Sequence, residues 1–470
     1  MAKKDSSSDK NIYRVLKIRV KKGHPLFNYF DQKTFFAKNL YNIGNFYRRQ
    51  LFTGLSKEEN LRHANEKEVI AVVNNTISLL NSEKTLNDSE KIPLRSSERK
   101  SLNYGMLDGI FKKIKQPDYC SLPAQVNQQA LKRLCGDWDN FFKSLKDYKE
   151  NPDKYKKRPG IPKYKKKNGR MTTTFTNQVC KIQNSQLKFP KTKDRLNLGK
   201  YGFGDECLKE VRVVPTCGVF EVEIVLQQKD SEKISPGNTS RVIGIDLGVD
   251  NFATISNNFG EQPIIIKGKV IKSINQYYNK QKAHYYSILR QGQNENTGQF
   301  HSHRLNRLNL KRKAKLNDFM HKASFKVVEY CIKNQVGTIV AGKNPEQKQN
   351  INIGSRNNQN FVGIPFARFC QMLEYKAKEK GIDVIFQEES YTSKASFLDD
   401  DDIPSYGEAE AEKCKFSGKR KRGIYKRKNG KLINADINAA FNIIKKAIPD
   451  AFDRLGNRGI VFHPLVLSVA

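Results

Sequence analysis

The sequence predicts a mixed chain in which a C-terminal α/β domain follows a small β domain and a helical domain. Three observations support this prediction. Apolar residues recur at helical spacing through residues 31–150, strand-like alternation lies on both sides of that stretch, and short apolar runs alternate with amphipathic segments beyond residue 236. We therefore expect a β domain of residues 1–30 and 151–235, interrupted by a helical insert, and an α/β domain of residues 236–470.

The β domain is expected to take its first strand from the N-terminal region. Residues 16–21 alternate between apolar and basic side chains, which is typical of a half-buried strand. Farther on, strands at 211–214 and 219–226 are predicted to form a hairpin, whose sheet the N-terminal strand should complete. Residues 231–240 are rich in Ser, Pro and Gly and are expected to be the linker into the α/β domain.

The helical insert has its clearest signal before residue 150, where a stripe of apolar residues repeats with the helical period and predicts a core-facing helix. The stripe consists of Leu131, Leu134, Trp138, Phe141 and Leu145. Earlier in the insert, Ser56 followed by Glu59 predicts a capping box that begins another helix.

The α/β domain is predicted to contain alternating strands and helices. The expected strands are 242–245, 252–255, 264–266, 338–341 and 382–386, and the expected helices are 273–290, 303–333, 366–380 and 435–447. Acidic residues occupy the ends of three of these elements. Asp246 ends the first strand, Glu388 and Glu389 follow the last strand, and Asp436 lies in the first turn of the last helix. Metal-assisted phosphodiester cleavage needs such a set of carboxylates.

Asp246 is the residue around which we interpret this domain. An ionised Asp at the exit of a core strand is costly without a partner, so Asp246 is expected to face a cation or the wall of a site. The alternative is an Asp that only caps the hairpin between two strands. Two enzyme classes use a similar D-L-G hairpin. In RNase H-like nucleases the Asp holds catalytic metal, and in the actin and sugar-kinase ATPases the turn binds nucleotide phosphate.

The charge of the chain points to a polyanionic partner. Its 470 residues include 85 Lys and Arg but 48 Asp and Glu, a formal net charge of +37. Nine of the basic residues lie within 154–170 and ten within 413–431, and neither block contains an acid. Interleaved tyrosines can stack on unpaired bases while the cations follow the phosphates. The residues expected to bind nucleic acid are Lys156, Lys157, Arg158, Lys163, Tyr164, Lys165, Lys166, Lys167, Lys419, Arg420, Lys421 and Arg422.

The N-terminal sequence MAKKDSSSDK lacks the apolar run of a secretory signal, and no apolar stretch reaches 18 residues. We therefore expect a soluble intracellular protein that does not bind membranes. Its eight cysteines are scattered without a C-x-x-C pair, so they are expected to be free thiols, and none has zinc-finger spacing.

Three motifs surround the acids: GIDLGVDNFATI at Asp246, EESYTSK at residues 388–394 and NADINAAFNI at Asp436. Together they resemble the three RuvC motifs of the OrfB/TnpB family of transposon-encoded, RNA-guided DNA endonucleases, to which type V CRISPR effectors are related. The resemblance implies an RNase H-like RuvC nuclease domain, preceded by a β-barrel-like wedge domain with a helical recognition insert. It also implies catalytic Mg²⁺ or Mn²⁺, a guide RNA of the omega or CRISPR type, a double-stranded DNA target, and a prokaryotic, cytoplasmic, nucleoid-associated protein.

Two departures from the family pattern shape the expected site. Most members carry a Glu after the strand that corresponds to 338–341, but here that strand leads to Gly342. The resemblance to a subset of the family implies that the glutamate has been relocated to EESYTSK. The predicted metal ligands are then Asp246, Glu389 and Asp436, with Glu388 as the alternate.

The second departure concerns zinc. Many members place two C-x-x-C pairs between the second and third motifs, whereas residues 395–431 hold only Cys414. We therefore predict a degenerate insert without zinc, in which residues 413–431 form a basic loop beside the catalytic cleft.

Other functions compete with a guided nuclease. An ATPase is disfavoured because the chain lacks further Gly-rich phosphate loops and because that function leaves the positive charge unexplained. A catalytically silent, RNA-guided DNA-binding protein is the stronger alternative, although all three acids are present. An accessory role in DNA transposition has no separate support in the sequence.

Overall fold

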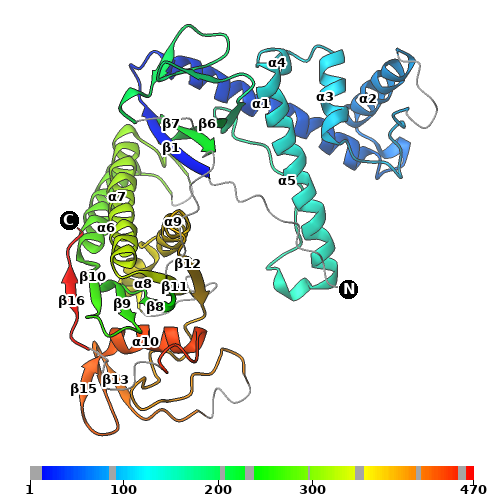
Figure 1. The fold of residues 1–470 in the computed structure, drawn as a ribbon. Helices are drawn as coiled ribbons and strands as arrows, with labels where there is room; N and C mark the ends of the chain where they lie inside the picture. Colours follow the sequence, from blue (N-terminus) through cyan, green and yellow to red (C-terminus); the bar gives the residue numbers. More distant parts are fainter. Residues whose placement is uncertain are drawn as a thin grey trace. The chain divides into compact units, whose positions relative to one another are not determined.

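The computed structural model describes residues 13–83, 91–201, 207–227, 238–294, 297–343, 354–408, 414–453 and 462–469. These residues belong to two compact units, Met1–Asp230 and Ser231–Ala470, both drawn in Figure 1. We describe each unit separately.

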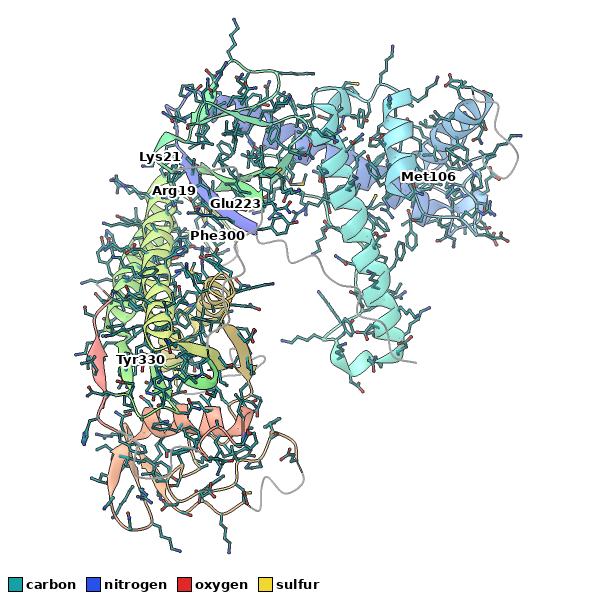
Figure 2. The ribbon with its side chains drawn as sticks, in the orientation of Figure 1. Arg19, Lys21, Met106, Glu223, Phe300 and Tyr330 are labelled. Carbon is teal, nitrogen blue, oxygen red and sulfur yellow. The ribbon has the colours of Figure 1, made fainter. Side chains whose placement is uncertain are left out.

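The first unit contains a four-stranded antiparallel sheet in the order β1-β7-β6-β2. Its strands are β1 (Tyr13–Val20), β2 (Thr173–Thr176), β6 (Cys207–Thr216) and β7 (Val219–Gln227). Pairing of β1 with β7 is confirmed along the whole of β1, which completes the hairpin sheet as predicted. Figure 2 labels Arg19 on β1 and Glu223 on β7, and Glu223 accepts a hydrogen bond from Lys17 at 2.6 Å. A second sheet consists of β3 (Lys181–Gln183), β4 (Gln186–Lys188) and β5 (Arg195–Asn197).

The helices of the first unit share one core with its sheet. They are α1 (Leu26–Gly54), α2 (Ala64–Ser82), α3 (Tyr104–Lys113), α4 (Pro117–Cys120) and α5 (Ala124–Glu150), with single 3-10 turns at Glu59–Leu61, Pro152–Lys154 and Gly199–Tyr201. The predicted boundary at residue 31 falls inside α1. Phe30 packs its ring 5.0 Å from that of Phe189 and 6.0 Å from that of Phe220, because one apolar cluster runs from the helices into the β part.

The capping box predicted at Ser56 lies elsewhere. The Ser56 hydroxyl donates to the Phe52 carbonyl, and the next α-helix begins only at Ala64. There the Glu66 carboxylate accepts the backbone N–H of His63 at 2.9 Å. The S-x-x-E pattern occurs where the chain makes a 3-10 turn, so the sequence signal was right in kind and wrong in position.

The second unit is built on a mixed six-stranded sheet in the order β12-β11-β8-β9-β10-β16. Its strands are β8 (Asn238–Asp246), β9 (Asn251–Asn257), β10 (Ile264–Lys267), β11 (Val336–Gly342), β12 (Asp383–Gln387) and β16 (Leu465–Leu467). Strands β8, β9 and β10 pair antiparallel, whereas β11 and β12 run parallel to β8. The first five of these strands in chain order lie where the sequence predicts strands. Strand β8 begins three residues before the end of the predicted 231–240 linker.

Helices cover both faces of this sheet (Figure 1). On one face lie α6 (Lys269–Leu289), α7 (His303–Lys333) and α9 (Phe366–Lys378), packed with Ile243 and Ile245 of β8. On the other lies α10 (Ala435–Ala447), which packs with Val242. Gly244 shares that second face, where an added Cβ would lie only 2.3 Å from the Ala440 carbonyl oxygen. The glycine therefore allows α10 to pack closely on β8. A short α8 (Ser355–Val362) precedes α9.

The basic segment before α10 is a small sheet, which corrects the prediction of a loop. Strands β13 (Lys419–Lys421), β14 (Ile424–Lys426) and β15 (Leu432–Asn434) pair antiparallel, and β15 leads directly into α10. The buried Tyr425 anchors this sheet, since its hydroxyl donates to the Lys394 carbonyl at 2.7 Å. None of the helices in the described ranges combines the length and apolarity that a membrane crossing requires.

Candidate active site and nucleic-acid surfaces

Strand register brings two of the predicted acids to one edge of the second unit. Parallel strands end on the same side of a sheet, and Ala341 of β11 lies opposite both Ile245 of β8 and Phe386 of β12. Asp246 therefore leaves β8 at the edge where Glu389 follows β12. Side chains alternate along a strand, so Asp246 lies on the same face as Val242 and Gly244, which is the face that α10 covers.

Asp436 is carried to this edge by the start of α10. The Asn434 side chain caps the helix by accepting the backbone N–H groups of Asp436 at 3.0 Å and Ile437 at 3.1 Å. Asn251, at the start of β9, donates its amide to Asp436 Oδ2 at 2.7 Å. Arg420 donates to Asp436 Oδ1, also at 2.7 Å. Both carboxylate oxygens of Asp436 are thus engaged by protein donors.

Burial and mutual repulsion raise the pKa values of two of the acids. Burial, and then the charge of Asp436, raises the pKa of Asp246 to about 7, and the nearby Arg420 opposes this shift. Burial, followed by the charges of Asp246 and Glu388, raises the pKa of Glu389 to about 8. Acids with raised pKa values at one edge form a site that disfavours further negative charge and favours a bound cation.

Gly342 gives Glu389 its space. A Cβ built on Gly342 would lie 2.1 Å from Glu389 Oε1, so any other residue at the end of β11 would collide with this carboxylate. Gly342 is two residues beyond Val340 and shares the face that α10 covers. The Glu389 carboxylate therefore lies above the end of β11, next to the end of β8.

Glu388 has different surroundings. Its Oε2 accepts a hydrogen bond from the buried Lys446 at 2.7 Å, and its Oε1 accepts the backbone N–H of Ser390 at 2.8 Å. Burial alone would raise its pKa, but the hydrogen bonds from Lys446 and Ser390 outweigh it, and the pKa is lowered. Glu388 is thus the ionised partner of a lysine on α10, whereas Glu389 faces Asp246.

Two asparagines of α10 hold the segment that follows Glu389, a role that the sequence did not reveal. Asn438 donates to the Ala395 carbonyl at 2.7 Å and accepts the Phe397 N–H at 3.0 Å. Asn442, one turn later, donates at 2.8 Å to the carbonyls of both Thr392 and Ala395. Both asparagines are fully buried. Asn434, Asn438 and Asn442 are spaced four residues apart and so share one face of the helix. This spacing could have indicated a face that binds polar backbone groups, because buried amides need hydrogen-bond partners.

The donor set suits a hard divalent cation, since Asp246, Glu389 and Asp436 offer only carboxylate oxygens. Within the described ranges, however, no three Asp, Glu, His or Cys side chains come close enough together to hold a metal ion. Arg420 and Asn251 engage both carboxylate oxygens of Asp436. Withdrawal of Arg420 would free one oxygen of Asp436 for a cation.

The insert at residues 395–431 does not fit zinc. Its sequence holds one cysteine and no histidine. An acidic residue instead joins its two sides: Asp401, which is buried, accepts the backbone N–H groups of Ser396 at 2.7 Å and Ser417 at 3.0 Å. A second link joins Asp399 to Arg427 at 2.7 Å. Hydrogen bonds to carboxylates thus connect the parts of the insert.

In the first unit, the basic block 154–170 is fastened to one face of α1. Polar side chains at three- and four-residue spacing on the helix bind the backbone of the block, which leaves most of its cations free to point outward. The donor and acceptor pairs are Asn45 Nδ2 to Pro162 O at 3.0 Å, Asn42 Nδ2 to Lys165 O at 2.9 Å and Lys38 Nζ to Lys167 O at 2.5 Å. Arg170 completes the attachment with two hydrogen bonds to Asp31, each 2.8 Å long.

Seven of the eight predicted residues in this block are exposed: Lys156, Lys157, Arg158, Lys163, Tyr164, Lys166 and Lys167. Lys165 differs, because it is half-buried with its ammonium 4.4 Å from the centre of the Tyr41 ring. Arg49 of α1 lies 5.0 Å from the centre of the Tyr164 ring and supports one side of it. A fixed backbone with outward cations and a supported aromatic ring is suited to bind phosphates and to stack on a base.

The second basic block belongs to the second unit. Lys419, Lys421 and Arg422 are exposed on β13 and the turn after it. Arg420, which is predicted with them to bind nucleic acid, is also exposed and forms an ion pair with Asp436. The two blocks therefore lie on different units, and the second contacts one of the predicted metal ligands directly.

Comparison with known proteins finds two matching family models. Residues 223–347 match OrfB_IS605, described as a probable transposase, and residues 366–443 match the Cas12f1-like TNB domain. Similar solved structures include a Cas12f1–sgRNA–target DNA complex, 16% identical with a TM-score of 0.31, covering 92% of this chain and 98% of that chain. A CRISPR-Cas12f ternary complex is also 16% identical with a TM-score of 0.31, covering 85% and 81%.

No curated protein matches the chain. The resemblance to the OrfB family that the motifs predict is confirmed for residues 223–347, whereas residues 366–443 match the Cas12f1-like TNB model. The first contains Asp246, and the second contains Glu389 and Asp436. The chain therefore carries an OrfB_IS605 transposase segment and a Cas12f1-like TNB segment, and the candidate active site is assembled from both.

Proposed function

We propose that this protein is an RNA-guided DNA endonuclease that hydrolyses phosphodiester bonds at a RuvC-type site made of Asp246, Glu389 and Asp436. The observation that carries the proposal is the position of Glu389, whose carboxylate occupies the space above Gly342 and faces Asp246. A glutamate relocated from the end of β11 to the end of β12 accounts for that position. The matches to OrfB_IS605 and to the Cas12f1-like TNB domain support the same function.

The three acids share one role in this proposal, and other residues position them. Asp246, Glu389 and Asp436 would hold Mg²⁺ or Mn²⁺, which when bound supplies an activated water and stabilises the leaving oxygen. Asn251 and Asn434 orient Asp436, one through its carboxylate and the other through its backbone N–H. Lys446 neutralises Glu388 and so keeps that carboxylate out of the acid cluster.

Arg420 links the site to its substrate. In the absence of a ligand its guanidinium neutralises Asp436, which offsets part of the repulsion between the acids. A DNA phosphate entering the site would compete for the guanidinium, because a phosphate can accept two parallel hydrogen bonds from an arginine, whereas Asp436 accepts one from Arg420. Arg420 would then leave Asp436 free for metal and hold the strand to be cut.

The guide RNA is assigned to the basic surfaces. We propose that the first unit provides the wedge and recognition functions, since it holds the exposed cations of 154–170 beside Tyr164. The RuvC-like unit would hold the DNA strand through Lys419, Lys421 and Arg422. A net charge of +37 favours a polyanionic partner, and a bound guide RNA would neutralise much of this charge.

The test begins with the RNA that co-purifies with the protein. Once that RNA is sequenced, a DNA containing its complement is offered to the complex in Mg²⁺. Cutting that stops with Asp246→Ala or Asp436→Ala, while guided binding persists, supports the proposal. Unchanged cutting in either variant would remove the acid cluster from the reaction, and loss of binding as well would show a structural role.

A catalytically silent, RNA-guided DNA-binding protein is the second candidate, and one observation favours it. Arg420 and Asn251 engage both oxygens of Asp436, and no three metal-binding side chains converge within the described ranges. Under that function, target binding would be intact and the wild-type complex would leave DNA uncut in both Mg²⁺ and Mn²⁺.

A further inference from the structure

The helical hairpin of α6 and α7 is a third basic surface, separate from the two basic blocks. Residues 269–317 carry eleven Lys and Arg against one acid, Glu295, and the rest of α7 adds three lysines against Asp318 and Glu329. The hairpin lies on the face of the sheet opposite α10 (Figure 1). Figure 2 shows Phe300 at its far end and Tyr330 near the sheet. Helices with so one-sided a charge are expected to meet a polyanion.

Between the two helices lies a cavity of about 350 Å³, which is within the size range of small-ligand sites. Its lining combines aromatic rings with cations, and includes Tyr277, Tyr278, Leu308, Lys311, Arg312 and Lys315. Such a lining suits a planar base with phosphates beside it. An uncharged aromatic metabolite would make no use of the two exposed lysines that line the cavity, Lys311 and Lys315.

One wall of the cavity is held rigid before any ligand binds. Arg312 donates to the buried Asn275 at 2.8 Å and to the Gly363 carbonyl at 3.1 Å. Its guanidinium lies 4.7 Å from the centre of the Tyr278 ring, whose hydroxyl donates to Asn309 at 2.7 Å. Arg312 and Tyr278 therefore present a fixed, planar, partly cationic surface.

The other groups at the cavity are available to a ligand. The Tyr277 side chain is 55% exposed and makes no hydrogen bond or ring contact within the described part of the chain. Lys311 and Lys315 lie one turn apart on α7, and neither forms an ion pair with any residue in the described ranges. An exposed tyrosine beside two unpaired lysines can stack on one base and bind the phosphates on either side of it.

We propose that the α6–α7 cavity binds one unpaired nucleotide of the guide RNA, with Tyr277 stacked on the base and Lys311 and Lys315 on the flanking phosphates. This inference rests on the proposed function, because it requires a guide. The RNA is favoured over the target DNA because loops and bulges of RNA present splayed bases. The cavity also lies across the sheet from α10, on whose first turn the candidate catalytic Asp436 stands.

The experiment uses the full-length protein with its co-purifying RNA and maps the chemical reactivity of every nucleotide. We expect one unpaired nucleotide to be protected in the wild type and in Tyr277→Phe, and reactive in Tyr277→Ala. Loss of the stacked base should weaken RNA binding about 5- to 150-fold. Ultraviolet crosslinking of the complex with bound target DNA should join Tyr277 to the same nucleotide of the RNA.

A charge-matched pair of double variants completes the test. The double variant Lys311→Ala, Lys315→Ala should reduce the salt dependence of RNA binding by about two ions. The control double variant Lys280→Ala, Lys326→Ala lies outside the cavity and should leave the nucleotide protected. Unchanged protection in Tyr277→Ala, or a crosslink from Tyr277 to DNA, would overturn the inference and leave the proposed function intact. If no RNA co-purifies, the proposed function itself fails.

Discussion

The two adjacent glutamates should change stability in opposite directions when each loses its charge. Glu389 has a raised pKa, so its contribution to folding is fully present below about pH 4.5 and is lost as the pH rises through about 8. Glu388 has a lowered pKa, so its contribution is present at neutral pH and is lost on acidification. In metal-free protein at pH 8, Glu389→Gln should therefore stabilise the fold and Glu388→Gln should destabilise it.

The size of the first effect follows from the shift. Moving the Glu389 pKa from 4.5 to about 8 corresponds to about 4 to 5 kcal/mol. Partial contact with solvent and the accompanying change at Asp246 reduce this, so we expect Glu389→Gln to gain about 2 kcal/mol at pH 8 and well under 1 kcal/mol at pH 5. For a unit of residues 231–470 this is about 4 to 8 °C in Tm.

Scanning calorimetry of the RNA-bound protein in EDTA measures this difference at the two pH values. The protein supplies its own control, because its single tryptophan, Trp138, is buried in the first unit and its fluorescence follows that unit alone. The Trp138 transition should be the same in all variants. Equal shifts for the two glutamate variants, or a Glu389→Gln effect that does not change between pH 5 and pH 8, would refute the assignment of their surroundings.

Three further predictions follow from individual contacts. Asp401→Ala should lower the Tm of the second unit in scanning calorimetry. EDTA or a zinc chelator should leave that Tm unchanged, and a decrease on adding chelator would mean that the insert binds zinc. Arg420→Gln should lower the apparent Kd for Mn²⁺ about twofold to tenfold by calorimetric titration without target DNA, because Asp436 loses its ion-pair partner. Replacing Lys163, Lys166 and Lys167 with Gln should weaken RNA binding and reduce its salt dependence by about three ions, and an unchanged slope would place the RNA elsewhere.

The sequence predicted the last helix at both of its ends, and the physical reasons are local. Asn434 is a strong helix-capping residue, and the apolar residues that follow repeat with the helical period. The exit of Asp246 from a buried apolar strand was equally readable. The pairing of β1 with β7 in the first unit was predictable because the edge of a hairpin leaves backbone N–H and C=O groups unpaired until another strand binds them.

The remaining features depend on contacts that local sequence patterns do not report. Strands β13 and β14 are each three residues long, and β13 consists only of Lys and Arg, so the segment could not be told from a loop; pairing and the buried Tyr425 define the strands. The contact of Arg420 with Asp436 exists only because β15 leads into α10. The space above Gly342 likewise arises from the register of β11 with β12. Sequence patterns report periodicity and caps, but not which side chain fills a neighbour's space.

We propose that Glu389, and not Glu388, completes the acid site. The most direct test of this proposal is guided cleavage by the two isosteric variants, with target binding measured on the same complexes. We predict that Glu389→Gln binds its target normally and leaves it uncut in Mg²⁺ and Mn²⁺, whereas Glu388→Gln cuts at close to the wild-type rate at a temperature where both are folded. Cutting by Glu389→Gln together with loss of cutting by Glu388→Gln would move the role to Glu388, and cutting by both would contradict the relocated glutamate altogether.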